Sequence, residues 1–374
     1  MVEKNKLLYL VTDSTVANKF GLEQIEHLQT LGFNVTLVCG KGKLDVRYTK
    51  KDISVIQIEN LTREINFKKD INVLFELIKT INLIRPMALI YSTPKAALLG
   101  SISGRYCFVP IRVYQVLGAR WQTLTGMKRF YIKFLDRISL LLSTDVICVS
   151  HSMRTLYQNL TRQKLTVILN GSLIGVDQTI FNFQPKGNRN LILGYAGRIA
   201  SDKGIEDLLF FFKKVKIKFK NVKLEIVGDQ DTSDPVAAKV LDGVIFDPDI
   251  HWIGNLSRQD LAAQMRGWTL QIFPSKREGF GNVVIEAAAV GVPTICWDIE
   301  GVRNAIPQNL GHHLVPTGDH EMFVRTIENY IESPMSQIDQ KQLSIWAIEN
   351  FEKEKVLAGF GIYISSLLTI YNSK

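Results

Sequence analysis

Cysteine is scarce in this sequence, and its few cysteines stand far apart. Four occur among 374 residues, each inside an apolar run, and no two form a C-x-x-C pair. This spacing argues against a zinc site and against a framework of structural disulfides. We therefore expect a protein of the reducing cytoplasm.

Long apolar runs and a glycine fingerprint are also missing. No run approaches the roughly 18 apolar residues that a membrane helix needs, and the charged start MVEKNKLLYLVTD resembles no signal peptide. A G-x-G-x-x-G sequence does not follow the first predicted strand. An NAD-dependent oxidoreductase is therefore the weakest of the enzyme classes that we consider.

Acidic residues are scarce in one half of the chain. Residues 1–180 hold 24 Lys and Arg against 13 Asp and Glu, a balance of +11, whereas residues 181–374 hold 21 against 23, a balance of −2. Between Leu77 and Leu135 there are nine basic residues and no acidic one. The first half is thus suited to an anionic partner: a membrane surface, a phosphorylated substrate or nucleic acid. Nucleic acid is disfavoured, because aromatic stacking positions are not interleaved with the basic residues.

Short apolar segments alternate with amphipathic ones along the whole chain. Strands are predicted at residues 7–13, 34–40, 54–58, 88–93, 111–117, 145–150, 192–198, 223–229, 250–254, 270–275 and 292–298. Helices are predicted at residues 19–31, 67–84, 204–219, 257–267, 282–290 and 320–332. Apolar strands separated by helices indicate an α/β protein whose parallel sheets are covered on both faces.

The length fits two domains, and the alternation pauses over residues 170–190, which are rich in Gly, Asn and Pro. We interpret this segment as the linker between two doubly wound, Rossmann-like domains that face a cleft. Ligands of open α/β sheets bind at the carboxyl ends of the strands. The turns from strand to helix are therefore the places to search for a site.

The turn GYAGRIASDKGIEDLL carries two cations, Arg198 and Lys203, in one short loop. Arg can fork across two oxygens, Lys adds a point charge, and a helix start favours anions. The loop therefore suits a diphosphate, although a solvated loop has the same residue types.

The turn SKREGFGNVVIEAAAVGVP, residues 275–293, carries two carboxylates eight positions apart, Glu278 and Glu286. Its glycines let backbone N–H groups approach a ligand, and Asn282 is the predicted N-cap of the following helix. Glu286 interrupts an apolar helix, where an unpartnered charge costs several kcal/mol. We expect one carboxylate to face a sugar and the other to accept hydrogen bonds from ribose.

The segment GRIASDKG, followed about 75 residues later by EGFGNVVIE, resembles the retaining glycosyltransferases of family 4, which have the GT-B fold and an E-x7-E motif. The resemblance extends to VILNGSLIGVD and GHHLVPTGD and covers nearly the whole chain. It implies an acceptor-binding domain over 1–180, a nucleotide-sugar-binding domain over 181–355, and a C-terminal helix over 356–374 that returns to the first domain.

The resemblance also implies a catalytic set. Arg198 and Lys203 would neutralise the departing diphosphate, and Glu278 would contact hydroxyls of the transferred sugar. The family retains anomeric configuration, generally by front-face attack in which the leaving phosphate accepts the acceptor's proton. The protein then mainly positions groups and stabilises charge.

Further donor contacts are implied by the same resemblance. Backbone N–H groups of Phe280, Gly281 and Asn282 would assist at the sugar, Glu286 would bind ribose, and the base would stack near Gly254.

One position departs from the family pattern. Members often carry His in a V-Y-T-V-H-G-L-G-F segment near the donor's 6-hydroxyl, whereas VYQVLGARW places Leu117 there. Either the donor lacks that hydroxyl, or Arg120 supplies a substitute contact, or sub-families simply vary at this position.

Two D-x-D sequences, at 229–231 and 247–249, raise the possibility of a metal. Because Arg198 and Lys203 can already neutralise a diphosphate, we expect no metal and no cofactor besides the nucleotide-sugar. The histidines also lack ligand spacing.

The segment 126–143 can form an amphipathic helix. Two stripes are expected on it: a basic one of Arg129, Lys133 and Arg137, and an apolar one of Phe130, Phe134, Ile138 and Leu141. Such a helix could lie on anionic lipid or could simply pack on the core with a solvated face.

These observations predict a hexosyl- or N-acetylhexosaminyl-type glycosyltransferase. It would use a nucleotide-diphosphate sugar, most simply a UDP-sugar, and a lipid-diphosphate-linked or saccharide acceptor. Bacterial lipopolysaccharide or capsule synthesis is the expected setting, with the protein cytoplasmic and peripheral on the inner face of the membrane. The alternatives are a nucleotide-sugar epimerase on the same scaffold and a non-catalytic assembly partner, although the intact set of charged residues argues against the latter.

Overall fold

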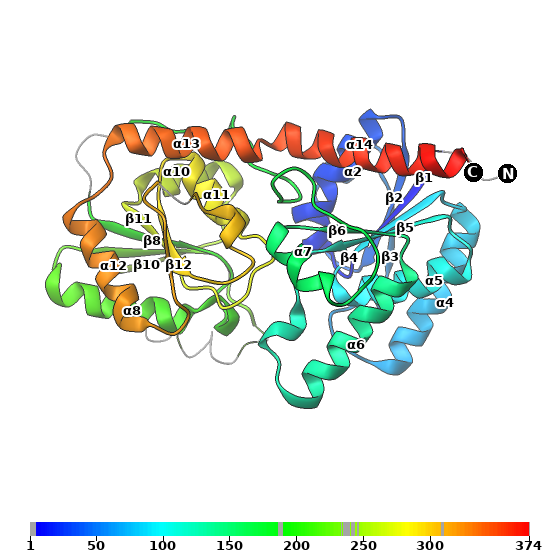
Figure 1. Ribbon diagram of the computed structural model, residues 1–374, viewed down its shortest axis with the longest axis horizontal. Helices are drawn as coiled ribbons and strands as arrows, with labels where there is room; N and C mark the ends of the chain where they lie inside the picture. The colour runs from blue at the N-terminus through cyan, green and yellow to red at the C-terminus, as the bar shows by residue number, and fades with distance from the viewer. Residues whose placement is uncertain are drawn as a thin grey trace. The chain divides into compact units, whose positions relative to one another are not determined.

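The computed structural model describes residues 5–185, 190–232, 234, 240, 244, 247–307 and 310–373. The chain forms two compact units (Figure 1). Unit 1 comprises Met1–Ile174 with Glu354–Lys374, and unit 2 comprises Gly175–Lys353. Residues 186–189 of the expected linker lie outside the described residues.

Unit 1 is built on a seven-stranded parallel sheet in the order β3-β2-β1-β4-β5-β6-β7. Its strands are β1 (Lys6–Leu10), β2 (Asn34–Gly40), β3 (Ser54–Ile58), β4 (Ala88–Ser92), β5 (Ile111–Val116), β6 (Asp145–Cys148) and β7 (Leu165–Thr166). All five residues of the central strand β4 are buried, as expected for a parallel strand covered on both faces.

Helices cover both faces of this sheet. They are α1 (Ser14–Val16), the π-helical η1 (Ala17–Gly21), α2 (Leu22–Thr30), α3 (Arg47–Lys50), α4 (Phe67–Ile84), α5 (Pro94–Tyr106), η2 (Arg120–Thr123), α6 (Gly126–Leu142), α7 (His151–Gln158) and α14 (Lys353–Asn372). On one face, α2 shares a core with the C-terminal helix α14, which contributes Phe360, Ile364 and Leu368. On the other face, α5 packs between α4 and α6 (Figure 1).

Unit 2 repeats this plan with a six-stranded parallel sheet in the order β10-β9-β8-β11-β12-β13. Its strands are β8 (Ile192–Ala196), β9 (Lys223–Val227), β10 (Ile250–Gly254), β11 (Leu270–Phe273), β12 (Thr294–Trp297) and β13 (His313–Val315). Its helices are η3 (Ser201–Lys203), α8 (Ile205–Lys218), α10 (Arg258–Gly267), α11 (Asn282–Ala289), η4 (Arg303–Ala305), α12 (His320–Glu332) and α13 (Gln337–Phe351). Helices α8 and α12 share one core, while α11 packs against α10 and α13.

The predicted fold class is confirmed: each half is a doubly wound parallel sheet, and the C-terminal helix packs on the first unit. The predicted strands 34–40, 54–58 and 250–254 and the helices 67–84 and 320–332 have the observed bounds. The predicted helix 19–31 begins earlier and enters through the π-helical turn η1. Among the described residues, no helix combines the length and the apolarity needed to cross a membrane.

Candidate functional site

The candidate site lies where the order of the strands reverses in unit 2. Strands β8 and β11 are neighbours in the sheet, although the chain visits β9 and β10 between them. Their carboxyl ends, at Ala196 and Phe273, therefore form the topological switch point of this sheet. Ligands bind at such points because the loops diverge there and leave a crevice.

The loops after β8 and β11 bring two of the predicted residues into contact. Lys203 Nζ lies 2.7 Å from Glu278 Oε1, and each side chain is only 17% exposed. Lys203 also donates to the carbonyl of Arg277 at 3.1 Å. The hydroxyl of Ser275 donates to the same Glu278 oxygen at 2.9 Å. The Glu278 carboxylate is thus fixed by two donors, which is how a positioned catalytic group is held.

Two glycines allow these loops to approach so closely. Gly204 has φ +72°, and a Cβ atom there would lie 2.0 Å from the carbonyl oxygen of Pro274. A Cβ atom on Gly301 would lie 1.9 Å from the carbonyl oxygen of Glu278. A side chain at Gly204 would push the loop after β11 away from the Lys203 loop, and one at Gly301 would displace the backbone of Glu278.

Arg198 lies in the same loop as Lys203 and contacts carboxylates. Its guanidinium bonds to Asp231 and lies 3.5 Å from Asp202. The Tyr195 hydroxyl donates to the Arg198 carbonyl at 2.8 Å. Burial, together with the nearby carboxylates Glu278 and Asp202, raises the pKa of the Tyr195 phenol, so this donor stays protonated. The Arg198 guanidinium is 41% exposed and is oriented by carboxylate oxygens. Phosphate oxygens are acceptors of the same kind.

Three of the four carboxylates considered as metal ligands contact basic side chains. Asp247 and Asp249 both contact Lys216, at 3.1 and 2.6 Å, and Asp231 contacts Arg198. Among the residues that the structure describes, no group of three or more His, Cys, Asp and Glu side chains is placed to hold a metal ion.

Glu286 has a partner that sequence reasoning missed. Its carboxylate is 8% exposed and lies 3.0 Å from the guanidinium of Arg258, the first residue of α10. The Arg258 guanidinium also stacks over the Phe181 ring, 5.1 Å from its centre. This ion pair explains how an apolar helix accommodates a carboxylate. The only signal in the sequence was an arginine just after a predicted strand and a Ser N-cap.

The three predicted donor contacts that follow Glu278 differ in what they offer. Phe280 is 3% exposed and packs edge-on against Phe351, so only its backbone is available. Gly281, with φ +85°, is the N-cap of α11, and Asn282 is the first helical residue. The predicted N-cap at Asn282 was wrong by one residue, because the left-handed glycine itself starts the helix. The positive end of the α11 dipole therefore begins directly at the Glu278 loop.

The remaining predicted residues lie elsewhere. Gly254 ends β10 with φ +80°, and nothing stands within 4 Å of where its Cβ would be, so a ligand can approach it closely. Leu117 and Arg120 belong to unit 1, on the loop after β5; Leu117 is half-buried and Arg120 is exposed. Within unit 2, the switch-point cluster contains Arg198, Lys203 and Glu278.

The predicted amphipathic helix is α6, and its apolar stripe faces outward. Phe130, Phe134 and Leu141 are exposed, Ile138 is half-buried, and Met127 and Tyr131 add to the same exposed surface. The opposite face buries Asp136, which accepts hydrogen bonds from Tyr114, Trp121 and Tyr157. Helix α6 thus packs on the core through one face and exposes the apolar stripe on the other, and membrane contact stays a prediction.

Comparison with known proteins gives a consistent result. Residues 176–347 match the family model described as glycosyl transferases group 1. The capsular polysaccharide biosynthesis glycosyltransferase CapM of Staphylococcus aureus is 30% identical over 88% of each chain. The Escherichia coli UDP-Gal:alpha-D-GlcNAc-diphosphoundecaprenol alpha-1,3-galactosyltransferase is 22% identical over 92% of this chain and 89% of its own. The structure of Anabaena HepE in complex with UDP-glucose superimposes with a TM-score of 0.76 at 15% identity, over 96% of this chain and 99% of that one. The architecture is that of GT-B proteins.

Proposed function

Because the chain belongs to the glycosyl transferases of group 1, we propose that it is a retaining enzyme of family 4 that transfers a hexosyl or N-acetylhexosaminyl group from a UDP-sugar. The observation that carries the proposal is the contact between Lys203 and Glu278 at the β8/β11 switch point, with Arg198 in the same loop. Cations for a diphosphate and a carboxylate for a sugar stand side by side there, as transfer from a nucleotide-sugar requires.

Each residue has a role in this proposal. Arg198 and Lys203 stabilise the charge that develops on the diphosphate as it leaves. Glu278 orients the transferred sugar, helped by backbone N–H groups of Phe280, Gly281 and Asn282 at the start of α11. The leaving phosphate takes the proton of the acceptor hydroxyl, so that attack and departure occur on one face and the configuration is retained. The two cations and the helix start supply the charge stabilisation, so the proposal needs no metal.

The nucleotide lies along the carboxyl ends of β10 and β11 in this proposal. Glu286, fixed by Arg258, accepts hydrogen bonds from ribose, and the base stacks near Gly254. UDP is favoured because the galactosyltransferase relative is named for a UDP-sugar and HepE was crystallised with one. Leu117 offers no hydrogen bond to a 6-hydroxyl, so the sugar lacks that group, or meets Arg120 instead, or is bound without this contact because sub-families vary here.

The acceptor is proposed to be a lipid-diphosphate-linked saccharide in capsule or other surface polysaccharide synthesis. Support comes from the names of CapM and of the diphosphoundecaprenol galactosyltransferase, and from the basic balance of residues 1–180. Unit 1 binds this acceptor and unit 2 the donor. The exposed apolar stripe of α6, with the exposed Arg137 beside it, rests on the anionic inner face of the cell membrane.

The test is calorimetric titration with UDP, GDP and NAD. Hydrogen bonds between a guanidinium and phosphate contribute roughly 1.5–3 kcal/mol, so Arg198→Ala should weaken UDP binding by about 10- to 100-fold. Arg325→Ala is the matched control, because Arg325 is an exposed arginine of the same unit on α12. Binding of neither UDP nor GDP, or UDP binding that is indifferent to Arg198, would show that the phosphate site is misassigned.

A further inference from the structure

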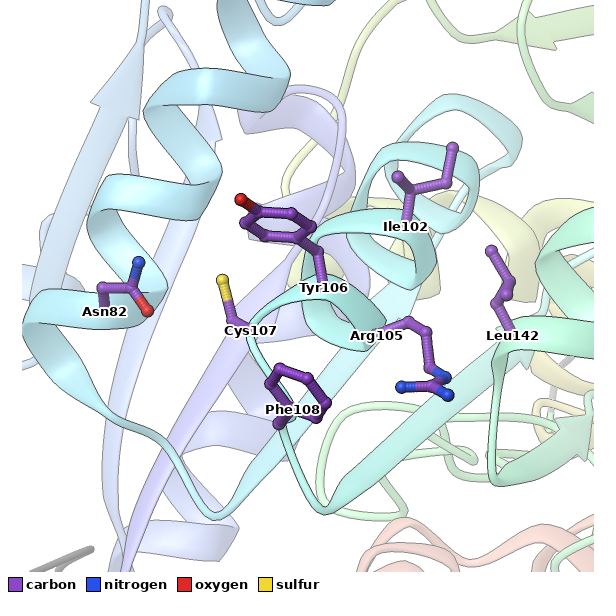
Figure 2. Close-up of a pocket in the computed structure, with 7 residues that line it drawn as sticks. All are labelled: Asn82, Ile102, Arg105, Tyr106, Cys107, Phe108 and Leu142. Carbon is purple, nitrogen blue, oxygen red and sulfur yellow. The ribbon is translucent and has the colours of Figure 1, made fainter.

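Unit 1 has a pocket whose lining contains none of the predicted site residues. It has a volume of about 720 Å³ and lies around the C-terminal ends of α4, α5 and α6 (Figure 2). Its lining consists of Asn82, Ile102, Arg105, Tyr106, Cys107, Phe108 and Leu142. Each of these helices leads into the next strand of the sheet, so the pocket opens at the amino ends of the strands. Leu117 and Arg120 follow the carboxyl end of β5, at the opposite edge.

The rim of the pocket carries side chains that a folded protein normally hides. Tyr106 is 67% and Phe108 80% exposed. Phe108 also has φ +56°, the left-handed region that disfavours residues with a Cβ. The left-handed turn itself ends α5, because the backbone N–H groups of Phe108 and Val109 donate to the carbonyls of Arg105 and Gly104 at 3.3 and 2.9 Å. Glycine is the usual residue at this position, so the exposed Phe108 ring adds nothing to the helix ending, which points to a role in binding.

The charged residue of the pocket lining, Arg105, is basic. Arg105 is exposed, and its guanidinium lies 6.0 Å from the centre of the Phe108 ring. The pocket lies mostly within the stretch from Leu77 to Leu135 that has no acidic residue. An apolar pocket with a cationic rim is complementary to a ligand with an apolar chain and an anionic head.

The pocket continues the exposed apolar stripe of α6. The exposed apolar stripe of α6 runs from Met127 to Leu141, and the next residue, Leu142, lines the pocket. A bilayer that meets α6 along its length therefore reaches the pocket at the end of that helix.

We propose that this pocket is a lipid site: it takes an acyl chain of an anionic membrane lipid, Phe108 and Tyr106 enter the bilayer interface, and Arg105 binds the headgroup phosphate. The proposal rests on the proposed membrane contact of α6 and adds a second point of attachment. Two points fix the orientation of unit 1 on the membrane, and the second lies away from the edge of the sheet where acceptors bind.

The first test is sedimentation of the full chain with phosphatidylcholine vesicles, with and without phosphatidylglycerol. The chain should bind the anionic vesicles more strongly, and Phe108→Gly should weaken that binding by about 10-fold through loss of one inserted ring. Because glycine adopts φ +56° without strain, this variant should melt no lower than the parent chain. Ile217→Ala, which shortens an exposed apolar side chain of unit 2, should bind vesicles like the parent.

The second test uses the thiol that lines the pocket. Cys107 is half-buried, whereas Cys39, Cys148 and Cys296 are buried, so a maleimide should label Cys107 first. A lipid chain in the pocket should slow this labelling several-fold in the presence of anionic vesicles. The variant Cys107→Ser should lack the fast-reacting thiol, which would identify that thiol as Cys107.

The outcomes distinguish the lipid site from the α6 membrane contact and from the donor site. Weaker vesicle binding by Phe108→Gly together with protection of Cys107 supports the lipid site. Vesicle binding that is unchanged in Phe108→Gly, with Cys107 unprotected, overturns the pocket but leaves α6 as the membrane contact. If the parent chain binds neither kind of vesicle, the pocket and the α6 contact are both wrong, whereas the UDP titration still decides the donor site.

Discussion

Glu286 and Arg258 illustrate at the scale of single residues how the candidate site is organised. The carboxylate of Glu286 is almost fully buried in an Ala-rich helix, and its guanidinium partner comes from the start of another helix, α10. One carboxylate oxygen can be held by Arg258 while the other faces a ligand. Arg258 is thus a positioning residue for a group that we propose to bind ribose.

Replacing Arg258 tests this positioning role. Arg258→Gln should weaken UDP binding by about 10-fold, because a free carboxylate leaves its productive orientation. The preference for UDP over 2′-deoxy-UDP should shrink as well, since Glu286 is the proposed partner of the ribose hydroxyls. Calorimetric titration with both nucleotides measures the two effects, with Arg325→Gln as the control. A uniform loss of affinity for both nucleotides would mean that Arg258 only stabilises the fold.

His312 makes folding sensitive to acid. Burial lowers the pKa of its ring to about 3, and its Nδ1 accepts the backbone N–H of Thr294 at 3.0 Å. The native ring stays neutral while the unfolded one takes up a proton below pH 6.5. Stability is therefore complete above pH 6.5 and is lost as the pH falls toward 3, by up to about 1.4 kcal/mol per pH unit.

Urea unfolding at pH 7.5 and pH 5 checks this dependence. The free energy of unfolding should fall at pH 5, and His312→Asn, which keeps an acceptor for Thr294, should reduce the difference. The neighbouring His313 also has a pKa lowered by burial, so the comparison between variants isolates His312. An equal pH dependence in both proteins would contradict this assignment.

Site residues could be predicted where they lie close together in the sequence. They could not be predicted where only the fold brings them together. Arg198, Lys203, Glu278 and Glu286 stand out because strand-to-helix turns seldom combine such charges with glycines. Arg258 does not stand out, because its partner is 28 positions away and one helix over.

The C-terminal helix α14 completes the core of unit 1 at the scale of elements. Phe360, Ile364 and Leu368 recur at a spacing of four residues and join the core residues of α2 and the sheet. The opposite side of α14 is exposed, as at Ile362. The helix thus behaves as a structural part of a unit whose other residues lie at the start of the chain.

Truncating a buried side chain of α14 should loosen unit 1. Phe360→Ala should lower the stability of that unit by about 3–5 kcal/mol, the usual cost of a cavity. Hydrogen exchange measured by mass spectrometry should show faster exchange in β1 and β2, with the strands of unit 2 less affected. Ile362→Ala on the same helix is the matched control and should exchange like the parent. Equal effects of the two substitutions would mean that α14 does not belong to this core.

Elements with regular apolar patterns were predictable, and those with unusual composition were not. Helix α5 was missed because its glycines lower helix propensity. Those glycines serve packing: a Cβ atom on Gly100 would lie 2.8 Å from Leu10 and one on Gly104 2.9 Å from Leu89. Strand β13 was missed because it has only three residues.

At the scale of the whole molecule, charge is divided unevenly along the chain. Residues 1–180 are strongly basic, whereas the cations of unit 2 at the switch point are paired with carboxylates. The alternation of strands and helices predicted both doubly wound sheets. It could not predict the pocket of unit 1, because helix ends far apart in the sequence form its walls.

One measurement tests the central claim most directly. The protein is incubated with an α-linked UDP-sugar and a lipid-diphosphate-linked saccharide, and the product is analysed by NMR. We expect UDP release that depends on the acceptor and a product with a new α-linkage. The variant Lys203→Met should show neither. A changed nucleotide-sugar formed without any acceptor would identify an epimerase instead, and a β-linked product would contradict retention.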